Sequence, residues 1–160
     1  MLPMPTFPAV VAVLLTCAAV AQKNPVLTQL RRAAEKAPLA VAHRGASADY
    51  PENTLVAFRA AVAAKAEVVE FDVYQTKDGA WVCLHDATCD RTTDAVAKFG
   101  RKKVRIDALT LAEVRKLDAG SWFGAKFAGE PVPTLAAALK AILPAVPMIE
   151  RKGGSAEALA

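Results

Sequence analysis

The chain has 160 residues, of which 54% are hydrophobic, and a formal net charge of +4 at pH 7. This length predicts a single domain, and the hydrophobic content is ample for a buried core. Lysines and arginines are spread along the chain except at Arg101–Lys103, and few aromatic residues lie among them to stack on bases. We therefore expect no nucleic-acid partner, and we interpret the basic triplet as a solvent-exposed loop.

The N-terminus carries an almost unbroken apolar run, Phe7–Val20, and the residues Ala19–Ala21 are similar to a small-x-small cleavage site. We predict a signal peptide over residues 1–21 and a mature domain over residues 22–160. The protein would then be secreted or periplasmic. It would keep no stable membrane span, because a permanent anchor needs about 20 apolar residues. A lipoprotein signal at Leu14–Cys17 is the weaker alternative, since a threonine before the cysteine fits that signal poorly.

Two cysteines, Cys83 and Cys89, would remain after cleavage of the signal peptide. Export would expose them to an oxidising compartment, but two cysteines six residues apart are far from a disulfide framework. We interpret them as structural residues, and the pattern leaves a disulfide between them open.

The mature chain begins with a predicted helix over residues 24–38, where apolar residues recur at helical spacing. Residues 39–42 form a brief apolar strand, which opens into a loop at His43-Arg44-Gly45. Pro51 suits the first turn of a helix, where its missing N–H group costs nothing. Apolar residues at helical spacing follow it and predict a helix over residues 51–65.

The next apolar run, residues 68–73, is typical of a strand buried in an α/β fold. Its two carboxylates, Glu70 and Asp72, lie two residues apart and therefore point to the same side of the sheet. The pair Asp78-Gly79 before the next β-rich run predicts a hairpin with a two-residue loop. That register would place Asp72 directly opposite His85.

A polar insertion follows, in which Thr110 and Glu113 form a capping-box pattern that predicts a helix to about Leu117. A second helix begins after Pro133-Thr134, and residues 148–152 form a short strand that ends in charged residues. The order of elements, with polar residues at the ends of strands, predicts an α/β fold of the TIM (β/α)8-barrel type. Such barrels take about 250 residues, so about four strands here indicate only the N-terminal half.

The polar residues at the strand ends combine the groups that cleave a phosphate ester. Three carboxylates offer oxygen ligands to a hard divalent cation such as Ca²⁺ or Mg²⁺, and two histidines could serve as general acid and base. An arginine and a lysine are available for a phosphate. Together they indicate phosphoryl-ester cleavage. The residues are Glu70, Asp72 and Glu150, His43 and His85, and Arg44 and Lys152.

Several ordered motifs between residues 40 and 152 resemble those of the glycerophosphodiester phosphodiesterase family. The motifs are His43-Arg44-Gly45, Pro51-Glu52-Asn53-Thr54, Glu70-Phe71-Asp72-Val73, Thr76-Lys77-Asp78-Gly79, His85-Asp86, Asp90-Arg91-Thr92-Thr93, Leu117–Trp122, Pro133-Thr134-Leu135 and Glu150-x-Lys152. The resemblance implies a TIM-barrel hydrolase that splits deacylated phospholipids, such as glycerophosphocholine, into glycerol 3-phosphate and an alcohol. It also implies that the substrate's own glycerol hydroxyl attacks phosphorus and that water then opens the cyclic phosphate.

The resemblance assigns a role to each candidate site residue. His43 and His85 match the acid–base pair, Arg44 and Lys152 match the cations on the phosphate side, and the metal ligands are matched by Glu70, Asp72 and Glu150. The chain departs from the family at Lys65, where a glycine is usual, and in lacking the later strands that complete the barrel.

Two alternative functions stay open. A partial barrel leaves a strand edge and apolar faces uncovered, so the chain could be a non-catalytic fragment that acts as a binding or assembly module. It could also be a related TIM-barrel phospholipase that acts on intact lipids, although no amphipathic, aromatic-rich segment for docking to lipid is evident. For the enzyme, the expected partner is a small-molecule glycerophosphodiester; the oligomeric state is undetermined.

Overall fold

The computed structural model describes residues 24–155. The predicted signal peptide, residues 1–21, lies outside this range. The described residues fall into two compact units, residues 24–39 and 40–155. No helix in the described part of the chain is long and apolar enough to cross a membrane.

The first unit contains helix α2, Pro25–Ala34. Its N-cap is Asn24, whose side-chain oxygen accepts hydrogen bonds from the backbone N–H groups of Val26 and Leu27. This cap satisfies donors that have no partner within the first helical turn. The helix predicted over residues 24–38 is confirmed, although it ends at Ala34.

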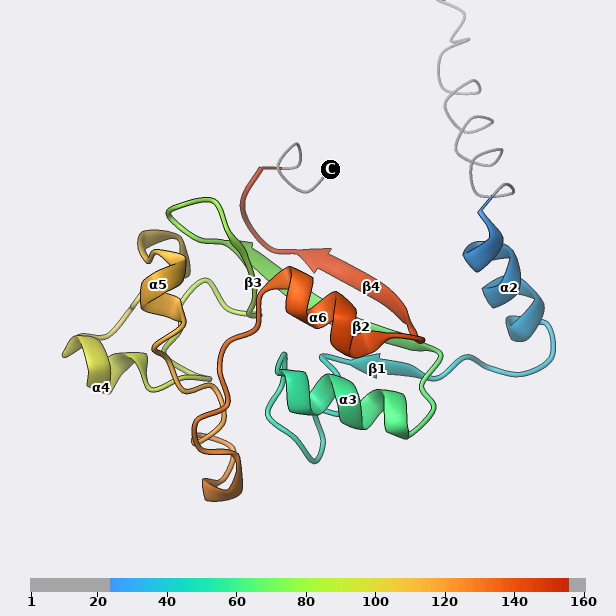
Figure 1. The fold of residues 1–160 in the computed structure, drawn as a ribbon, viewed down its shortest axis with the longest axis horizontal. Coiled ribbons are helices and arrows are strands. Elements are labelled where there is room, and N and C mark those ends of the chain that lie inside the picture. The colour runs from blue at the N-terminus through green and yellow to red at the C-terminus, as the bar shows by residue number, and fades with distance from the viewer. Residues whose placement is uncertain (1–23, 156–160) are drawn as a thin grey trace, which may run out of the picture. The chain divides into compact units, whose positions relative to one another are not determined.

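The second unit is built on a four-stranded sheet (Figure 1). Its strands are β1 (Val41–His43), β2 (Val68–Gln75), β3 (Trp81–Cys83) and β4 (Val146–Arg151). β2 is central, with β1 and β4 parallel to it on its two edges and β3 antiparallel to its C-terminal end. The number of strands agrees with the prediction, and the three parallel strands are the part of the sheet that a (β/α) barrel repeats.

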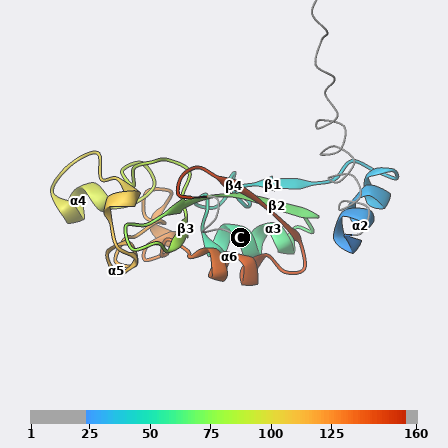
Figure 2. The ribbon, with the colours of Figure 1, turned by 90° about the horizontal axis from the view of Figure 1, so that it is seen from above.

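Two helices cover one face of the sheet, as Figure 2 shows: α3 (Leu55–Ala63) and α6 (Leu135–Ile142). Alternate residues of β2, among them Val69 and Phe71, belong to the apolar cluster that these helices complete. The rings of Phe58 and Phe71 lie 5.4 Å apart in this core. Burial of this layer fixes which side of β2 faces the helices, and the intervening residues Glu70 and Asp72 must therefore face the other side.

The opposite face of the sheet is only partly covered. Val41 is 49% exposed and Met148 is 48% exposed, and their register partners on β2 are Val68 and Glu70 respectively. Side chains in register on parallel strands share a face. The face that carries the candidate site therefore also carries exposed apolar surface.

The insertion between β3 and α6 has a core of its own. It contains α4 (Ala95–Phe99), α5 (Leu111–Val114) and two short 3₁₀ helices, Ile106–Ala108 and Ala125–Phe127. Thr110 and Glu113 form both hydrogen bonds of the predicted capping box, and α5 ends three residues before the predicted end. The basic triplet at residues 101–103 is exposed, as predicted.

Both cysteines are buried and free, as expected of structural residues. Cys83 lies at the end of β3 beside the main core, and Cys89 lies in the core of the insertion. Burial disfavours the thiolate and raises the pKa of Cys89 to about 12. No disulfide joins the two residues.

For the helix predicted over residues 51–65, the predicted start at Pro51 is wrong. α3 begins at Leu55, because Thr54 has extended backbone and its hydroxyl accepts a hydrogen bond from the backbone N–H of Ala57, as an N-cap does. The preceding Asn53 has a φ of 57°, in the left-handed region. Residues 51–53 are therefore a loop, and a left-handed residue cannot continue a right-handed helix.

The predicted hairpin exists, but its predicted register is wrong by one residue. Val73 pairs with Cys83, and the N–H of Leu84 bonds to the carbonyl of Asp72. Asp72 thus lies opposite Leu84, not His85. The loop contains three residues because the N–H of Thr76 bonds to the carbonyl of Ala80, and a left-handed glycine closes it, which is a common three-residue hairpin geometry.

Candidate active site

The site begins at the turn that follows β1. His43 is the last residue of the strand, and Arg44 and Gly45 both have left-handed backbone, with φ of 57° and 81°. A β-carbon at Gly45 would lie 2.8 Å from the carbonyl carbon of Ala57, so this turn needs a glycine to pack against α3. The turn directs the backbone N–H of Arg44 to Glu70, whose Oε2 accepts it at 3.0 Å.

Three carboxylates meet at the C-terminal ends of two parallel strands. Glu70 and Asp72 lie on β2, and Glu150 of β4 is the register partner of Asp72. One oxygen from each residue lies within 4.8 Å of the other two. Glu70 and Asp72 are buried, whereas Glu150 is exposed. The sequence predicted these three residues as metal ligands, and the fold brings them together.

The surroundings of Asp72 fit a divalent cation. The carboxylate is 1% exposed, and its Oδ2 accepts a hydrogen bond of 2.9 Å from the side-chain amide of Asn53. Its Oδ1 is buried and has no hydrogen-bond partner among the described residues. Nζ of Lys152 lies 3.4 Å from this oxygen as an ion-pair partner. A buried carboxylate oxygen that accepts no hydrogen bond and lies beside two other carboxylates is suited to bind Ca²⁺ or Mg²⁺.

The two predicted phosphate-binding cations border the same carboxylates. Nζ of Lys152 lies 2.6 Å from Oε1 of Glu150 and 3.4 Å from Oδ1 of Asp72. Nε of Arg44 lies 3.4 Å from Oδ2 of Asp72. The hydrogen bond from Lys152 lowers the pKa of Glu150, and the charges of His85 and Arg44 act in the same direction. These cations therefore surround the carboxylate cluster.

The two histidines differ in their surroundings. The side chain of His43 is 67% exposed, and its Nε2 lies 4.0 Å from Oε2 of Glu70. His85 is held more firmly, since its Nδ1 lies 2.7 Å from Oδ1 of Asp86. A carboxylate at that distance assigns the proton to Nδ1 and leaves Nε2 as the basic nitrogen. Nε2 is therefore the nitrogen of His85 that can accept a proton.

The structure adds four residues to the site that had no assigned role in the sequence: Glu52, Asn53, Asp86 and Arg91. Asn53 falls within the helix predicted over residues 51–65, but its amide donates to Asp72 and its side-chain oxygen accepts the N–H of Asp72. The signal for Asp86 was present, because a carboxylate directly follows a candidate catalytic histidine. The hydrogen bonds between Glu52 and Arg91 join residues that are 39 positions apart. No local sequence pattern indicates such a pair.

The matches to known proteins cover the same region as this site. The sequence model of the glycerophosphoryl diester phosphodiesterase family matches residues 43–155, a range that holds all seven predicted site residues. This chain belongs to that family. A glycerophosphodiester phosphodiesterase of Caldanaerobacter subterraneus is 48% identical to it over 97 residues, which are 61% of this chain and 37% of the relative.

Solved structures of the glycerophosphodiester phosphodiesterase family share the fold. A phosphodiesterase of Oleispira antarctica, in complex with the product sn-glycerol-3-phosphate, is 36% identical with a TM-score of 0.66 and covers 75% of this chain and 47% of its own. A glycerophosphodiester phosphodiesterase from Agrobacterium tumefaciens is 36% identical with a TM-score of 0.61 and covers 71% and 46%. The predicted fold class, part of a TIM barrel, is confirmed.

The chain spans only part of the family's usual length. Its matched region covers 33 to 38% of the first curated relatives. The part of the chain that matches the family nevertheless includes all three carboxylates of the cluster and both histidines.

Proposed function

We propose that the protein is a metal-dependent phosphodiesterase that hydrolyses glycerophosphodiesters, such as glycerophosphocholine, to glycerol 3-phosphate and an alcohol. The observation that carries the proposal is the carboxylate cluster of Glu70, Asp72 and Glu150, which is bordered by Arg44 and Lys152. Membership of the family supports it, and so does the bound sn-glycerol-3-phosphate in the Oleispira antarctica neighbour.

The three carboxylates would hold Ca²⁺ or Mg²⁺, and the cation would supply charge neutralisation at the phosphate oxygens. Arg44 and Lys152 add positive charge beside that position and orient the anionic substrate. His43 and His85 serve as the acid–base pair. One removes the proton from the substrate's glycerol hydroxyl as it attacks phosphorus, and the other protonates the leaving alcohol. Water then opens the cyclic phosphate with the proton transfers reversed.

An assay of the purified chain tests this function. Glycerophosphocholine is supplied with Ca²⁺, Mg²⁺ or EDTA, and release of glycerol 3-phosphate is measured. We expect release that depends on the cation and is nearly abolished in His43→Ala, His85→Ala and Asp72→Asn. The matched control is Asp107→Asn, a carboxylate in the insertion that pairs with Arg105. Absence of cation-dependent release from folded protein would overturn the proposal, and full activity in either histidine variant would refute the acid–base assignment.

A second candidate function, a non-catalytic assembly module, is favoured by one observation. Val41, Met148 and Ile149 are large apolar side chains on the sheet, and at least 36% of each is exposed. Exposed apolar surface of this kind marks interaction sites. Folded protein that forms defined oligomers but releases no glycerol 3-phosphate would support this candidate, and release from intact lysophospholipid alone would support a phospholipase instead.

The cellular location is a separate proposal. Its support is the apolar run and small-residue site in residues 1–21, which are typical of a secretory signal peptide. Expression of the chain with a C-terminal tag, followed by N-terminal sequencing of the exported protein, should show a mature end at Gln22. Retention in the cytoplasm with an uncleaved N-terminus would contradict it.

A further inference from the structure

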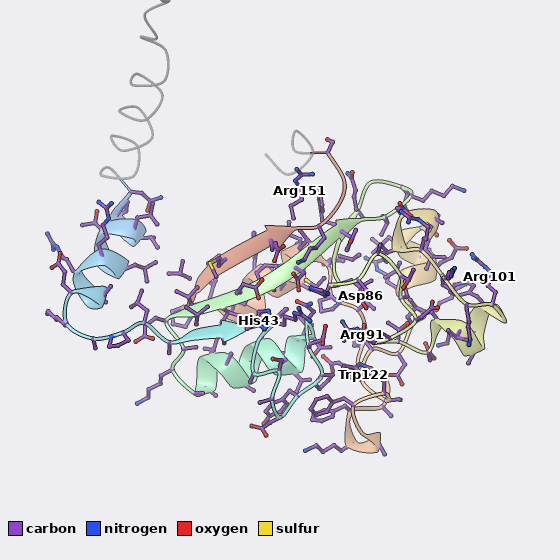
Figure 3. The ribbon with its side chains drawn as sticks, turned by 180° about the vertical axis from the view of Figure 1, so that it is seen from behind. His43, Asp86, Arg91, Arg101, Trp122 and Arg151 are labelled. Carbon is purple, nitrogen blue, oxygen red and sulfur yellow. The ribbon has the colours of Figure 1, made fainter. Side chains whose placement is uncertain are left out.

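Arg91 lies outside the seven predicted site residues but contacts the neighbours of two of them. Its guanidinium donates to both oxygens of Asp86, at 2.7 and 3.1 Å, and to both oxygens of Glu52, at 2.9 and 2.8 Å. Figure 3 shows Arg91 beside Asp86. Asp86 in turn contacts His85, and Glu52 accepts a hydrogen bond of 3.0 Å from Nη1 of Arg44.

We propose that Arg91 is a positioning residue that fixes His85 through Asp86 and Arg44 through Glu52. The inference rests on the proposed function, because His85 and Arg44 act on a substrate only if the protein is a phosphodiesterase. Arg91 would thus couple the residue that moves a proton to the residue that holds the phosphate, although the two follow different strands, β3 and β1.

The bond to Asp86 controls the imidazole. About a third of the Asp86 side chain is exposed, so this carboxylate could rotate into water if nothing else held it. Two charge-assisted hydrogen bonds from Arg91 keep it facing Nδ1 of His85. A fixed carboxylate keeps the proton on Nδ1, so that Nε2 stays available for the reaction.

The bond to Glu52 controls the phosphate-side cation. Nη2 of Arg91 and Nη1 of Arg44 share the Oε1 atom of Glu52, so one carboxylate holds two guanidinium groups. Arg91 bonds to both oxygens of Glu52 and so holds the carboxylate in an orientation in which Oε1 also accepts from Arg44. Only an arginine has enough donors, in a rigid planar arrangement, to bond two carboxylates through four hydrogen bonds.

The backbone around Arg91 is anchored in the insertion. Oδ2 and Oδ1 of Asp90 accept the backbone N–H groups of Lys103 and Val104. On the other side, the buried hydroxyl of Thr93 donates to the carbonyl of Cys89. Arg91 therefore projects from a loop that is held on both sides of it, at Asp90 and at Thr93, which is what a positioning residue requires.

Kinetics of Arg91→Met and Arg91→Lys test the inference. We expect kcat to fall by about 10- to 100-fold in Arg91→Met, the usual range for loss of an outer partner in such a site. KM should rise through the loosened Arg44. Arg91→Lys should recover only part of the loss, because an ammonium group cannot bond both carboxylates in the same planar geometry. Asp86→Asn should lower kcat, Glu52→Gln should mainly raise KM, and Arg91→Met should cost less kcat in the Asp86→Asn background.

Nitrogen NMR of the imidazoles gives a readout that does not depend on activity. The chain has only two histidines, so ¹⁵N-histidine labelling yields one signal set for His85 and one for His43. At a pH where both rings are neutral, His85 of the unaltered chain should carry its proton on Nδ1. Arg91→Met should convert it to a mixture of tautomers and leave the His43 signals in place. The matched control is Arg105→Met, which removes another arginine–aspartate pair and should change neither signal.

The outcomes separate the two proposals. If folded Arg91→Met and Arg91→Lys proteins keep Nδ1–H at His85 and kcat within about twofold, the positioning role is overturned. If Arg91→Met does not fold, the same two measurements on Arg91→Lys decide. An inactive unaltered chain whose His85 tautomer still responds to Arg91→Met would refute the proposed function and support the positioning role. An active unaltered chain whose His85 tautomer does not respond to Arg91→Met would support the proposed function and refute the positioning role.

Discussion

Asp72 shows how a single residue in this protein depends on partners that are remote in sequence. Its side chain is buried, and its neighbours come from the turn after β1, the loop before α3, and the end of β4. Asn53 contacts it twice, through its amide and its side-chain oxygen. Because a ligand's hydrogen-bonded partners set its orientation and basicity, Asn53 should matter to cation binding as well as to stability.

The variant Asn53→Ala tests that role. It leaves the buried Asp72 without one donor and one acceptor, which should lower the free energy of unfolding by about 1–3 kcal/mol. It should also weaken Ca²⁺ or Mg²⁺ binding by about 10- to 100-fold. Urea denaturation and calorimetric titration measure the two effects. The control Asn24→Ala removes the cap of α2 and should leave cation affinity unchanged; equal affinities in all three proteins would contradict the role of Asn53.

At the level of the elements, the connection from α3 to β2 explains one departure from the family. The N–H of Lys65 bonds to the carbonyl of Val62, and the N–H of Ala66 bonds to the carbonyl of Ala61, which is the Schellman pattern of a helix end. The pattern requires left-handed backbone at Lys65, where φ is 63°. A glycine adopts that conformation without steric cost. This explains why the resemblance leads one to expect a glycine where this chain has Lys65.

Lys65→Gly should therefore stabilise the protein. We expect the free energy of unfolding to rise by about 0.5–1 kcal/mol, since the steric cost of a left-handed residue exceeds the added freedom of glycine in the unfolded chain. Chemical denaturation measures the change. Lys140→Gly, the same substitution within α6, should instead destabilise by about 1 kcal/mol. If both variants lose stability, the interpretation of the turn is incorrect.

The molecule as a whole combines a complete set of candidate site residues with an incompletely covered sheet. The helices α3 and α6 bury one face (Figure 2), while Val41 and Met148 on the other face are about half exposed. The outer edge of β1 has no partner strand among the described elements. Apolar surface next to a free strand edge favours association between chains.

The chain on its own should accordingly self-associate, and Val41→Lys should reduce this association. The charge would oppose edge-to-edge pairing, and little stability should be lost because the residue is already half exposed. Sedimentation velocity over a range of protein concentrations measures the effect. Val26→Lys on α2, which replaces another exposed valine, is the control. Identical concentration dependence in the two variants would refute a role for the β1 edge.

The sequence alone determined much of the site. Short apolar runs that end in ionisable residues identified the strands, and the period of two placed Glu70 and Asp72 on one side of β2. The capping box at Thr110 was readable because its hydrogen bonds lie within four residues. The ordered motifs identified the family, which the match to residues 43–155 confirmed.

The tertiary structure decided the features that depend on backbone angles and on distant contacts. The hairpin register followed from a three-residue loop, and the start of α3 followed from the left-handed Asn53. The contacts of Arg91 with Glu52, and of Asn53 with Asp72, join residues 39 and 19 positions apart. Local patterns carry no information on such pairs, because only the packing of the strands, turns and insertion around one sheet brings them within hydrogen-bonding distance.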